Sequence, residues 1–159
     1  MKKIPLTNGQ FATVDDEDFK ELNQFTWQAQ WDADTRSFYA VRGVRLPNGK
    51  HVKELMHRRI LGLEYGDKRQ IDHIAHQTLD NRRANIRIVT PSQNQHNYRC
   101  KKGYTWNKSH RKYQAQIGVN GRRIFLGYFD GPQEARAAYL KAKAIYHPSA
   151  PIALLTRYF

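Results

Sequence analysis

Cysteine is nearly absent from this sequence: Cys100 is the only one in 159 residues. A single thiol excludes a disulfide framework and a cysteine-based zinc site, and we interpret it as a bystander. Long apolar runs and a secretory signal are also lacking, so we expect neither a membrane-spanning segment nor a membrane partner. These absences together indicate an intracellular protein.

Acidic residues are scarce in the last third of the chain. Residues 99–159 contain 12 Lys and Arg but only two Asp and Glu, a net charge of +10, whereas residues 1–54 are neutral and residues 55–98 carry +3. The aromatic content of 12% indicates a folded chain rather than a disordered basic tail. Such one-sided charge on a folded segment predicts a nucleic acid partner.

Strand and turn signals dominate residues 1–54. Asn8-Gly9 predicts a hairpin turn, and the acidic run Asp15–Asp18 suits the positive end of a short helix dipole. Alternating aromatic and apolar residues predict further strands beyond this helix. We interpret the segment as a β-rich platform, with Arg42 and Arg45 as candidate contacts to a DNA backbone.

A short helix is predicted at the start of the next segment, with Leu55, Ile60 and Leu61 on one face and a glycine at its end. It contains His57 beside two arginines. A histidine in this setting is more often structural or phosphate-contacting than catalytic, so we interpret His57 in that way.

The segment Ile71–Asn97 contains the residues best suited to chemistry. A hairpin followed by a helix would bring them together, with Asp72-His73 ending the first strand and Asn85–Val89 forming the second. Thr90 is the predicted N-cap of the helix, and the proline that follows suits the first helical position. The polar residues in question are Asp72, His73, Asn85, Asn94 and Asn97.

Hydrolysis of a phosphodiester requires an activated water and charge stabilisation at the phosphate. A neutral imidazole near pH 7 is a suitable general base, which is the role predicted for His73. Asp72 and Asn94 offer hard oxygen ligands, which favour Mg²⁺ or Mn²⁺ over zinc, and Asn85 would fix the loop beside His73. The candidate supports of this site are Asn97, Arg82, Arg83 and Arg87.

The C-terminal segment shows a different pattern. Tyr113–Val119 alternates as a half-buried strand, Asn120-Gly121 predicts a type I′ turn, and Pro132 opens a helix. Three antiparallel strands backed by one helix would leave one sheet face free to enter a major groove. The predicted apolar stripe of the helix is Ala135, Ala138, Tyr139, Ala142 and Ile145. The predicted DNA-binding residues are Lys102, Thr105, Asn107, Gln114, Gln116, Arg123 and Phe125.

The segment Met56–Asn97 resembles the HNH endonucleases of the phage and homing type. The resemblance is carried by the motifs HRRILGL and IDHIAHQTLDNRRANIRIVTPSQNQHN. The resemblance implies a ββα-metal hairpin with His73 as general base, Asp72 and Asn94 as metal ligands and Asn85 as the structural asparagine. Asn94 stands where many members have a final histidine. His76, in the hairpin loop, is a competing candidate for the base.

Residues 102–147 resemble the ethylene-responsive-factor (APETALA-type) DNA-binding domain. The markers of the resemblance are Gly103, Ala115, Ile117, the run Leu126-Gly127-Tyr128-Phe129-Asp130, and the helix through Glu134-Ala135 and Ala138-Tyr139. In the plant proteins this domain reads the major groove through its three-stranded sheet. Several of their base-reading Arg and Trp positions are Thr105, Asn107, Gln116 and Phe125 here, so the resemblance implies the fold but not the target sequence.

The sequence therefore predicts an α+β protein with a ββα-metal nuclease core. The predicted divisions are a β-rich platform at 1–54, an HNH domain at 55–98, a linker at 99–101, a DNA-binding domain at 102–147 and a tail at 148–159. The predicted function is a metal-dependent endonuclease acting on double-stranded DNA in the cytoplasm of a bacterial or phage-infected host cell. With one active centre per chain, a monomer that nicks is the simplest prediction. The alternatives are a non-catalytic DNA-binding regulator and an RNA-directed or toxin-like nuclease.

Overall fold

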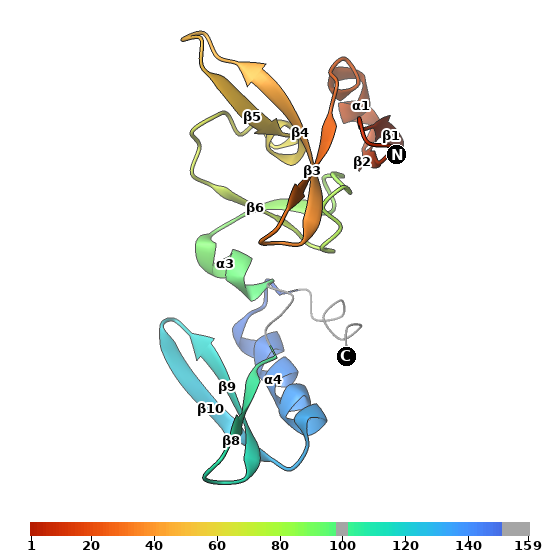
Figure 1. Ribbon diagram of the computed structural model, residues 1–159. Coiled ribbons are helices and arrows are strands. Elements are labelled where there is room, and N and C mark those ends of the chain that lie inside the picture. Colours follow the sequence, from red (N-terminus) through yellow and green to blue (C-terminus); the bar gives the residue numbers. More distant parts are fainter. Residues whose placement is uncertain (98–101, 151–159) are drawn as a thin grey trace. The chain divides into compact units, whose positions relative to one another are not determined.

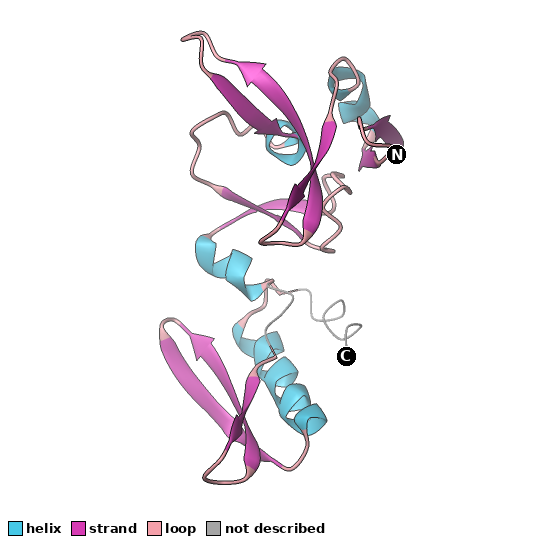
Figure 2. Ribbon diagram, viewed as in Figure 1, coloured by secondary structure: helices cyan, strands magenta, loops and turns pink. Residues whose placement is uncertain are grey.

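The structure, a computed structural model, describes residues 1–97 and 102–150 (Figure 1). The chain forms two compact units, Met1–Asn94 and Gln95–Phe159. The first unit combines small antiparallel sheets with short helices, and the second combines one antiparallel sheet with one long helix, which confirms the predicted α+β class (Figure 2). The predicted linker at 99–101, with Cys100, and residues 151–159 of the predicted tail lie outside the described residues. No helix within the described ranges is long and apolar enough to cross a membrane.

The first unit begins with a hairpin and a helix, as the sequence predicts. Strand β1 (Lys2–Pro5) pairs antiparallel with β2 (Phe11–Val14), and α1 (Asp16–Leu22) follows. Gly9 has a φ of 76°, a left-handed conformation that glycine adopts without steric cost. Three carboxylates occupy the first turn of α1, where the helix dipole favours them.

A three-stranded sheet and a second hairpin complete this unit. The sheet has the order β3-β4-β5, and α2 follows its last strand. The hairpin is formed by β6 and β7, and α3 comes directly after it. The bounds are β3 (Gln28–Asp32), β4 (Ser37–Arg45), β5 (His51–Leu55), α2 (Met56–Ile60), β6 (Gln70–His73), β7 (Ile86–Val89) and α3 (Pro91–His96).

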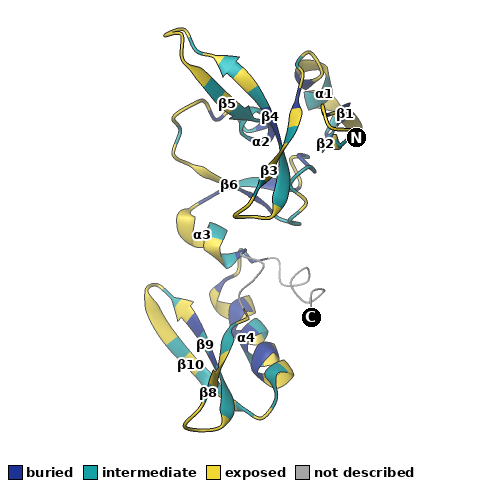
Figure 3. Cartoon of the chain, in the orientation of Figure 1, coloured by how far each residue is buried: buried dark blue, intermediate teal, exposed yellow. Residues whose placement is uncertain are grey.

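One hydrophobic core joins the N-terminal elements to the β6–β7 hairpin (Figure 3). Trp27 is completely buried in it, and its indole Nε1 donates a hydrogen bond of 2.9 Å to the carbonyl of Leu22. Residues 1–54 therefore supply much of the core on which the hairpin rests. The buried members are Ile4, Leu6, Ala12, Val14, Leu22, Trp27, Ala40, Met56, Ile60 and Ile86.

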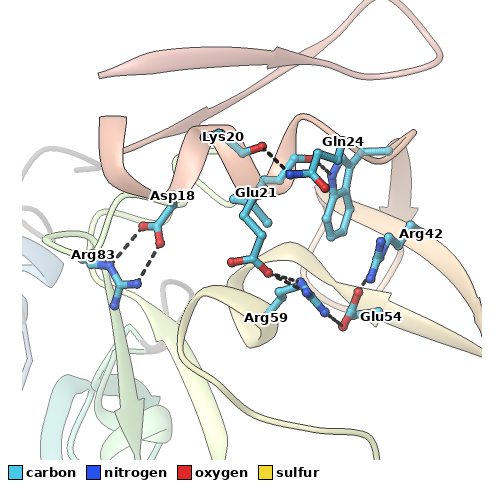
Figure 4. A network of polar contacts seen from close by, with 10 residues as sticks. Asp18, Lys20, Glu21, Gln24, Arg42, Glu54, Arg59 and Arg83 are labelled. Atoms are coloured by element: carbon cyan, nitrogen blue, oxygen red, sulfur yellow. Dashed lines mark hydrogen bonds and ion pairs between the residues drawn. The ribbon is translucent and has the colours of Figure 1, made fainter.

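Ion pairs join the same elements at the surface (Figure 4). Arg59 of α2 pairs with Glu21 of α1 at 2.5 Å and with Glu54 of β5 at 3.4 Å. Arg83, in the loop between β6 and β7, pairs with Asp18 of α1 at 2.7 Å. Helix α1 is thus tied both to α2 and to the loop of the hairpin.

Arg42 of β4 also has partners within the unit. Its Nε lies 2.5 Å from Glu54 Oε2, and its guanidinium lies 3.5 Å from the centre of the Phe25 ring. The side chain of Arg42 is only 12% exposed. Arg42 therefore stabilises the platform, and its contact with a DNA backbone stays a prediction.

The second unit consists of a three-stranded antiparallel sheet and one long helix. Its strands are β8 (Tyr104–Asn107), β9 (Lys112–Val119) and β10 (Arg122–Phe129), in the order β10-β9-β8, and α4 spans Pro132–Tyr146. Asn120 and Gly121 have φ values of 50° and 77°. Two successive positive values are those of a type I′ turn, as predicted.

The buried face of α4 differs from the predicted apolar stripe in one respect. Ala135, Tyr139 and Ala142 are buried as expected, but Ile145 is 73% exposed, so its assignment to the stripe was wrong. Lys143 is buried instead, with its Nζ 5.8 Å from the centre of the Tyr139 ring. The buried face is rotated toward Lys143, whose long aliphatic stem can cover apolar surface despite its charge.

Gly103 shows how closely α4 approaches the sheet. A Cβ atom on Gly103 would lie 2.0 Å from Cγ of Tyr139, and its φ of 78° is unfavourable for any side chain. Gly121, with nearly the same φ of 77°, has open space around its own Cβ position. These two glycines therefore separate the cost of backbone conformation from the cost of packing.

We predict that Gly103→Ala lowers the free energy of unfolding of the second unit by about 2–4 kcal/mol, because backbone strain and overpacking add. Gly121→Ala should cost about 1 kcal/mol, from strain alone. Hydrogen exchange of β9 amides in the full chain measures both effects. Equal losses in the two variants would contradict a tight contact between Gly103 and Tyr139.

Candidate active site

The end of the β6–β7 hairpin positions the Asp-His pair. Asp72 faces Arg87 across the two strands, and His73 faces Ile86. Because successive side chains of a strand point to opposite faces, Asp72 and His73 lie on different faces of the hairpin. Each face therefore brings a different set of neighbours to the site.

Asp72 is buried and paired with a cation. It is 6% exposed, and its Oδ2 accepts hydrogen bonds from Arg87 Nη2 at 2.8 Å and from Arg87 Nε at 3.1 Å. Burying a carboxylate away from solvent is costly unless a charged partner compensates it. Arg87 supplies this charge from the facing strand.

Asn94 approaches the face of Asp72 from α3. The helix starts with reciprocal bonds between Thr90 and Gln93, from Gln93 N to Thr90 Oγ1 (3.2 Å) and from Thr90 N to Gln93 Oε1 (2.9 Å). This capping box confirms Thr90 as the N-cap. Asn94 Nδ2 then donates to Gln70 Oε1 at 2.9 Å. Because Gln70 and Asp72 lie on one face of β6, Asn94 and Asp72 offer their oxygens on the same side.

These oxygens fit a hard divalent cation. A carboxylate and an amide oxygen are ligands that Mg²⁺ and Mn²⁺ accept, and Mg²⁺ usually keeps several waters. Within residues 1–97 and 102–150, no three His, Cys, Asp or Glu side chains come together in a way that could hold a metal. A site built on Asp72 and Asn94 would thus depend on water and substrate oxygens for its remaining ligands.

His73 points to the opposite side of the hairpin, where polar and aromatic side chains surround it. Its Nε2 lies 3.3 Å from Asn81 Oδ1, and its ring centre lies 5.0 Å from that of His57 and 6.0 Å from that of Tyr39. Burial lowers the pKa of His73, against a raising effect of the Asn81 contact and the charge of Asp72. The imidazole is therefore neutral at pH 7, the state in which it can accept a proton.

His57 lies next to His73, although it was not assigned to the site from the sequence. It is 7% exposed, and burial together with the neighbouring His73 lowers its pKa to about 3. Its ring is nearly perpendicular to that of His73, at 87°. Asn81 and Tyr39 were missed as well. Asn81 follows Asp80 within the recognised motif and could have been found there, whereas the strand pattern around Tyr39 has no signal that points to His73.

Asn85 closes the loop of the hairpin through its side chain. Its Oδ1 accepts a bond from Ala75 N at 2.8 Å, and its Nδ2 donates to Asp80 O at 2.7 Å and to Gln77 O at 3.2 Å. It lies one residue before β7, so the predicted start of the second strand at Asn85 was one residue too early. The amide ties together both sides of the loop that follows His73.

Three arginines predicted as supports have carboxylate partners within the first unit. Their side chains neutralise local acidic groups, and their roles toward a substrate stay predictions. The pairs are Arg82 with Asp80 at 2.6 Å, Arg83 with Asp18 at 2.7 Å and Arg87 with Asp72 at 2.8 Å.

Two other candidates lie in the segments that flank these strands. His76 lies in the loop of the hairpin, with a φ of 57°. Asn97 is buried, and it follows the end of α3 at His96 in the segment grouped with the second unit. The backbone N of His76 donates a hydrogen bond of 3.0 Å to the carbonyl of His73. The roles of His76 and Asn97 stay predictions.

In the second unit, the register brings the polar strand residues to one sheet face. Thr105 faces Gln114, and Gln116 faces Phe125, on the side of the sheet opposite α4. Asn107 and Arg123 share this side. Lys102 precedes β8, and its carbonyl accepts a bond of 3.0 Å from Arg136.

The contacts of Asn85 predict that its replacement destabilises the first unit much more than replacement of Asn94 does. Asn85→Ala leaves three backbone groups without their partner and should lower the free energy of unfolding of the first unit by at least about 2 kcal/mol. Asn94→Ala loses one surface hydrogen bond and should cost about 1 kcal/mol or less. Urea denaturation followed by tryptophan fluorescence measures both. Equal stabilities would refute the loop-closing role of Asn85.

Because His57 is buried, we predict that the stability of the first unit depends on pH. The pKa of His57 is about 3 in the folded unit and near 6.5 when exposed, so the unfolded chain gains a proton first as the pH falls. The free energy of unfolding should therefore decrease below pH 6.5, by about 2 kcal/mol at pH 5 from this group alone. Denaturation at pH 7.5 and pH 5 should show a weaker dependence for His57→Gln, whereas the exposed control His51→Gln should behave as the wild type.

Comparison with known proteins finds a family match for the part of the chain that contains this hairpin. The family model of the HNH endonucleases matches residues 54–96, which cover α2, both hairpin strands and α3. No curated protein and no solved structure matches the chain. The matched residues include Asp72, His73, Asn85 and Asn94. The comparison therefore supports an HNH nuclease that acts on DNA, with its HNH domain in residues 54–96.

Proposed function

We propose that this protein is a metal-dependent DNA endonuclease that hydrolyses phosphodiester bonds with His73 as general base. One observation carries the proposal: Asp72 and His73 end one strand of a hairpin, and Asn94 of the following helix lies on the face of Asp72. This arrangement occurs within the segment that matches the HNH endonucleases. In this proposal, a base and two oxygen ligands lie within one small motif.

In this proposal, the neutral imidazole of His73 takes a proton from a water molecule. The oxygen of that water attacks the phosphorus of the scissile phosphodiester, the bond to the 3′-oxygen breaks, and the leaving oxygen is protonated by solvent. Asn81 acts as a positioning residue because its Oδ1 lies 3.3 Å from His73 Nε2 and restrains the ring. The lowered pKa of His73 keeps the base unprotonated at neutral pH.

Asp72 and Asn94 would hold Mg²⁺ or Mn²⁺. When bound, such an ion supplies positive charge that stabilises the phosphate oxygens and the leaving oxygen. Arg87 compensates the charge of Asp72 in the folded chain. Asn85 holds the loop that follows His73, and thereby fixes where the base lies relative to Asp72.

The second unit would hold the duplex. Residues 99–159 carry a net charge of +10, and the sheet face opposite α4 is free of the helix. Polar side chains on a twisted antiparallel ribbon fit the major groove. We propose DNA contacts from Lys102, Thr105, Asn107, Gln114, Gln116, Arg123 and Phe125. With one active centre per chain, the expected product of a monomer is nicked DNA.

A supercoiled plasmid tests the nuclease. The wild type with Mg²⁺ or Mn²⁺ should convert it to the nicked form, and EDTA should abolish the conversion. His73→Ala should lower the rate about 10²–10⁴-fold, because a general base contributes about that much. DNA binding, measured by gel retardation, should persist in this variant.

His51→Ala is the matched control, since His51 is an exposed histidine of the same unit. Its nicking rate should equal that of the wild type. A plasmid that is retarded but never cut by the wild type, with either metal, would instead leave a DNA-binding protein without nuclease activity. Cutting that survives His73→Ala would overturn the assignment of the base.

A further inference from the structure

The free sheet face of the second unit has an unusual set of side chains at its centre. Helix α4 packs against Ala115, Ile117 and Ile124, which lie on one side of the sheet. The opposite side presents Phe125 and Tyr128, which are 54% and 36% exposed. Exposed aromatic rings on a folded surface commonly mark a binding site.

The aromatic residues form one contiguous group. The ring centres of Phe125 and Tyr128 lie 5.0 Å apart, edge to face. His110, from the loop between β8 and β9, stacks on Tyr128 at 4.2 Å with an interplanar angle of 17°. A register shift between Phe125 and Gly127 returns Tyr128 to the face of Phe125. The bulge thus builds this group by placing two rings of one strand side by side.

The amides beside these rings are not equivalent. Asn107 Nδ2 donates to Gln114 Oε1 at 3.0 Å, and Asn107 Oδ1 accepts from the backbone N of His110 at 3.1 Å. Gln116, the cross-strand partner of Phe125, makes no side-chain hydrogen bond within the described residues. Gln116 therefore keeps both its donor and its acceptor for a ligand.

Positive charge lies at the two ends of this face rather than at its centre. Arg123 faces Gly118 beside the β9–β10 turn, and Lys112 faces Asn107 at the other end. Lys112 is paired with Asp130 at 3.2 Å. Guanine is read mainly by Arg or Lys, whereas a Gln amide reads adenine through N6 and N7, and an apolar ring contacts the methyl group of thymine.

From this arrangement we propose that Gln116 and Phe125 are specificity-determining residues that read A·T base pairs in the major groove. The amide of Gln116 accepts a hydrogen bond from adenine N6 and donates one to adenine N7. Phe125 contacts the 5-methyl group of a thymine, and Tyr128 supports its ring. The inference rests on the proposed DNA binding by the second unit and names the base pairs that this unit selects. The net charge of +10 in residues 99–159 favours a duplex as the occupant of this face.

Selection from a randomised pool of duplex DNA tests the inference with the full chain in EDTA. The wild type should enrich sites that contain A·T pairs. Gln116→Ala and Phe125→Ala should lose that preference, whereas Gln133→Ala, an exposed glutamine of α4, should retain it. Enrichment of G·C pairs, or A·T enrichment that survives both substitutions, would overturn the inference.

Modified bases then assign each contact by fluorescence anisotropy on an enriched duplex. Replacing thymine by uracil removes the methyl group and should weaken wild-type binding about fourfold; the same change should have no effect on Phe125→Ala. Replacing adenine by 7-deazaadenine should weaken wild-type binding about tenfold and have no effect on Gln116→Ala. Equal sensitivity of wild type and variants to either modification would refute the corresponding contact.

The outcomes also separate this inference from the function on which it rests. A pool from which the wild type retains no duplex would remove the proposed DNA-binding role of the second unit itself. Duplex binding without base preference would leave that role intact and refute only the reading of A·T pairs. Tighter binding to single strands than to duplexes would show that the aromatic group stacks on unpaired bases, and would likewise refute the inference.

Discussion

The side-chain amide of Asn85 is the constraint on which the candidate active site depends. The loop between β6 and β7 is long for a hairpin, and its backbone groups need partners if the two strands are to stay paired. The side chain of Asn85 is the hydrogen-bond partner of three of these backbone groups, which belong to Ala75, Gln77 and Asp80. Since the loop is closed directly after His73, the position of the Asp-His pair follows from this closure.

The N-terminal platform gives the hairpin its rigid support. A two-stranded hairpin in water is marginally stable at best. Here Ile86 of β7 belongs to the same core as Trp27 and Ile4, so the hairpin shares the burial of a larger unit. The ion pair between Arg83 and Asp18 adds a surface connection to α1. The opposite faces of the hairpin then acquire different environments: a charged one around Asp72, and a buried, aromatic one around His73.

In the second unit, the two faces of a single sheet have different surroundings, and only one of them is proposed to bind DNA. On one face, Tyr139 lies so close to Gly103 that no side chain fits between helix and strand. Helix α4 packs only on this face, so the other face of the sheet does not contact the helix. There the bulge after Phe125 brings two exposed rings together beside Gln116, a combination of apolar and amide groups suited to base edges rather than to phosphates alone.

The sequence by itself determined the order of elements, the likeness of the segment around Asp72 and His73 to the HNH endonucleases, and the polar face of the second sheet. Each of these follows from local signals: turn dipeptides, a capping residue, alternation along strands and the spacing of a known motif. The tertiary structure alone decided that His57, Tyr39 and Asn81 surround His73, because three separate elements meet there. It also decided that Lys143 rather than Ile145 is buried on α4. The rotation of a helix on its sheet depends on the packing of Tyr139 against Gly103, a contact between residues too far apart in the chain for any local pattern to specify.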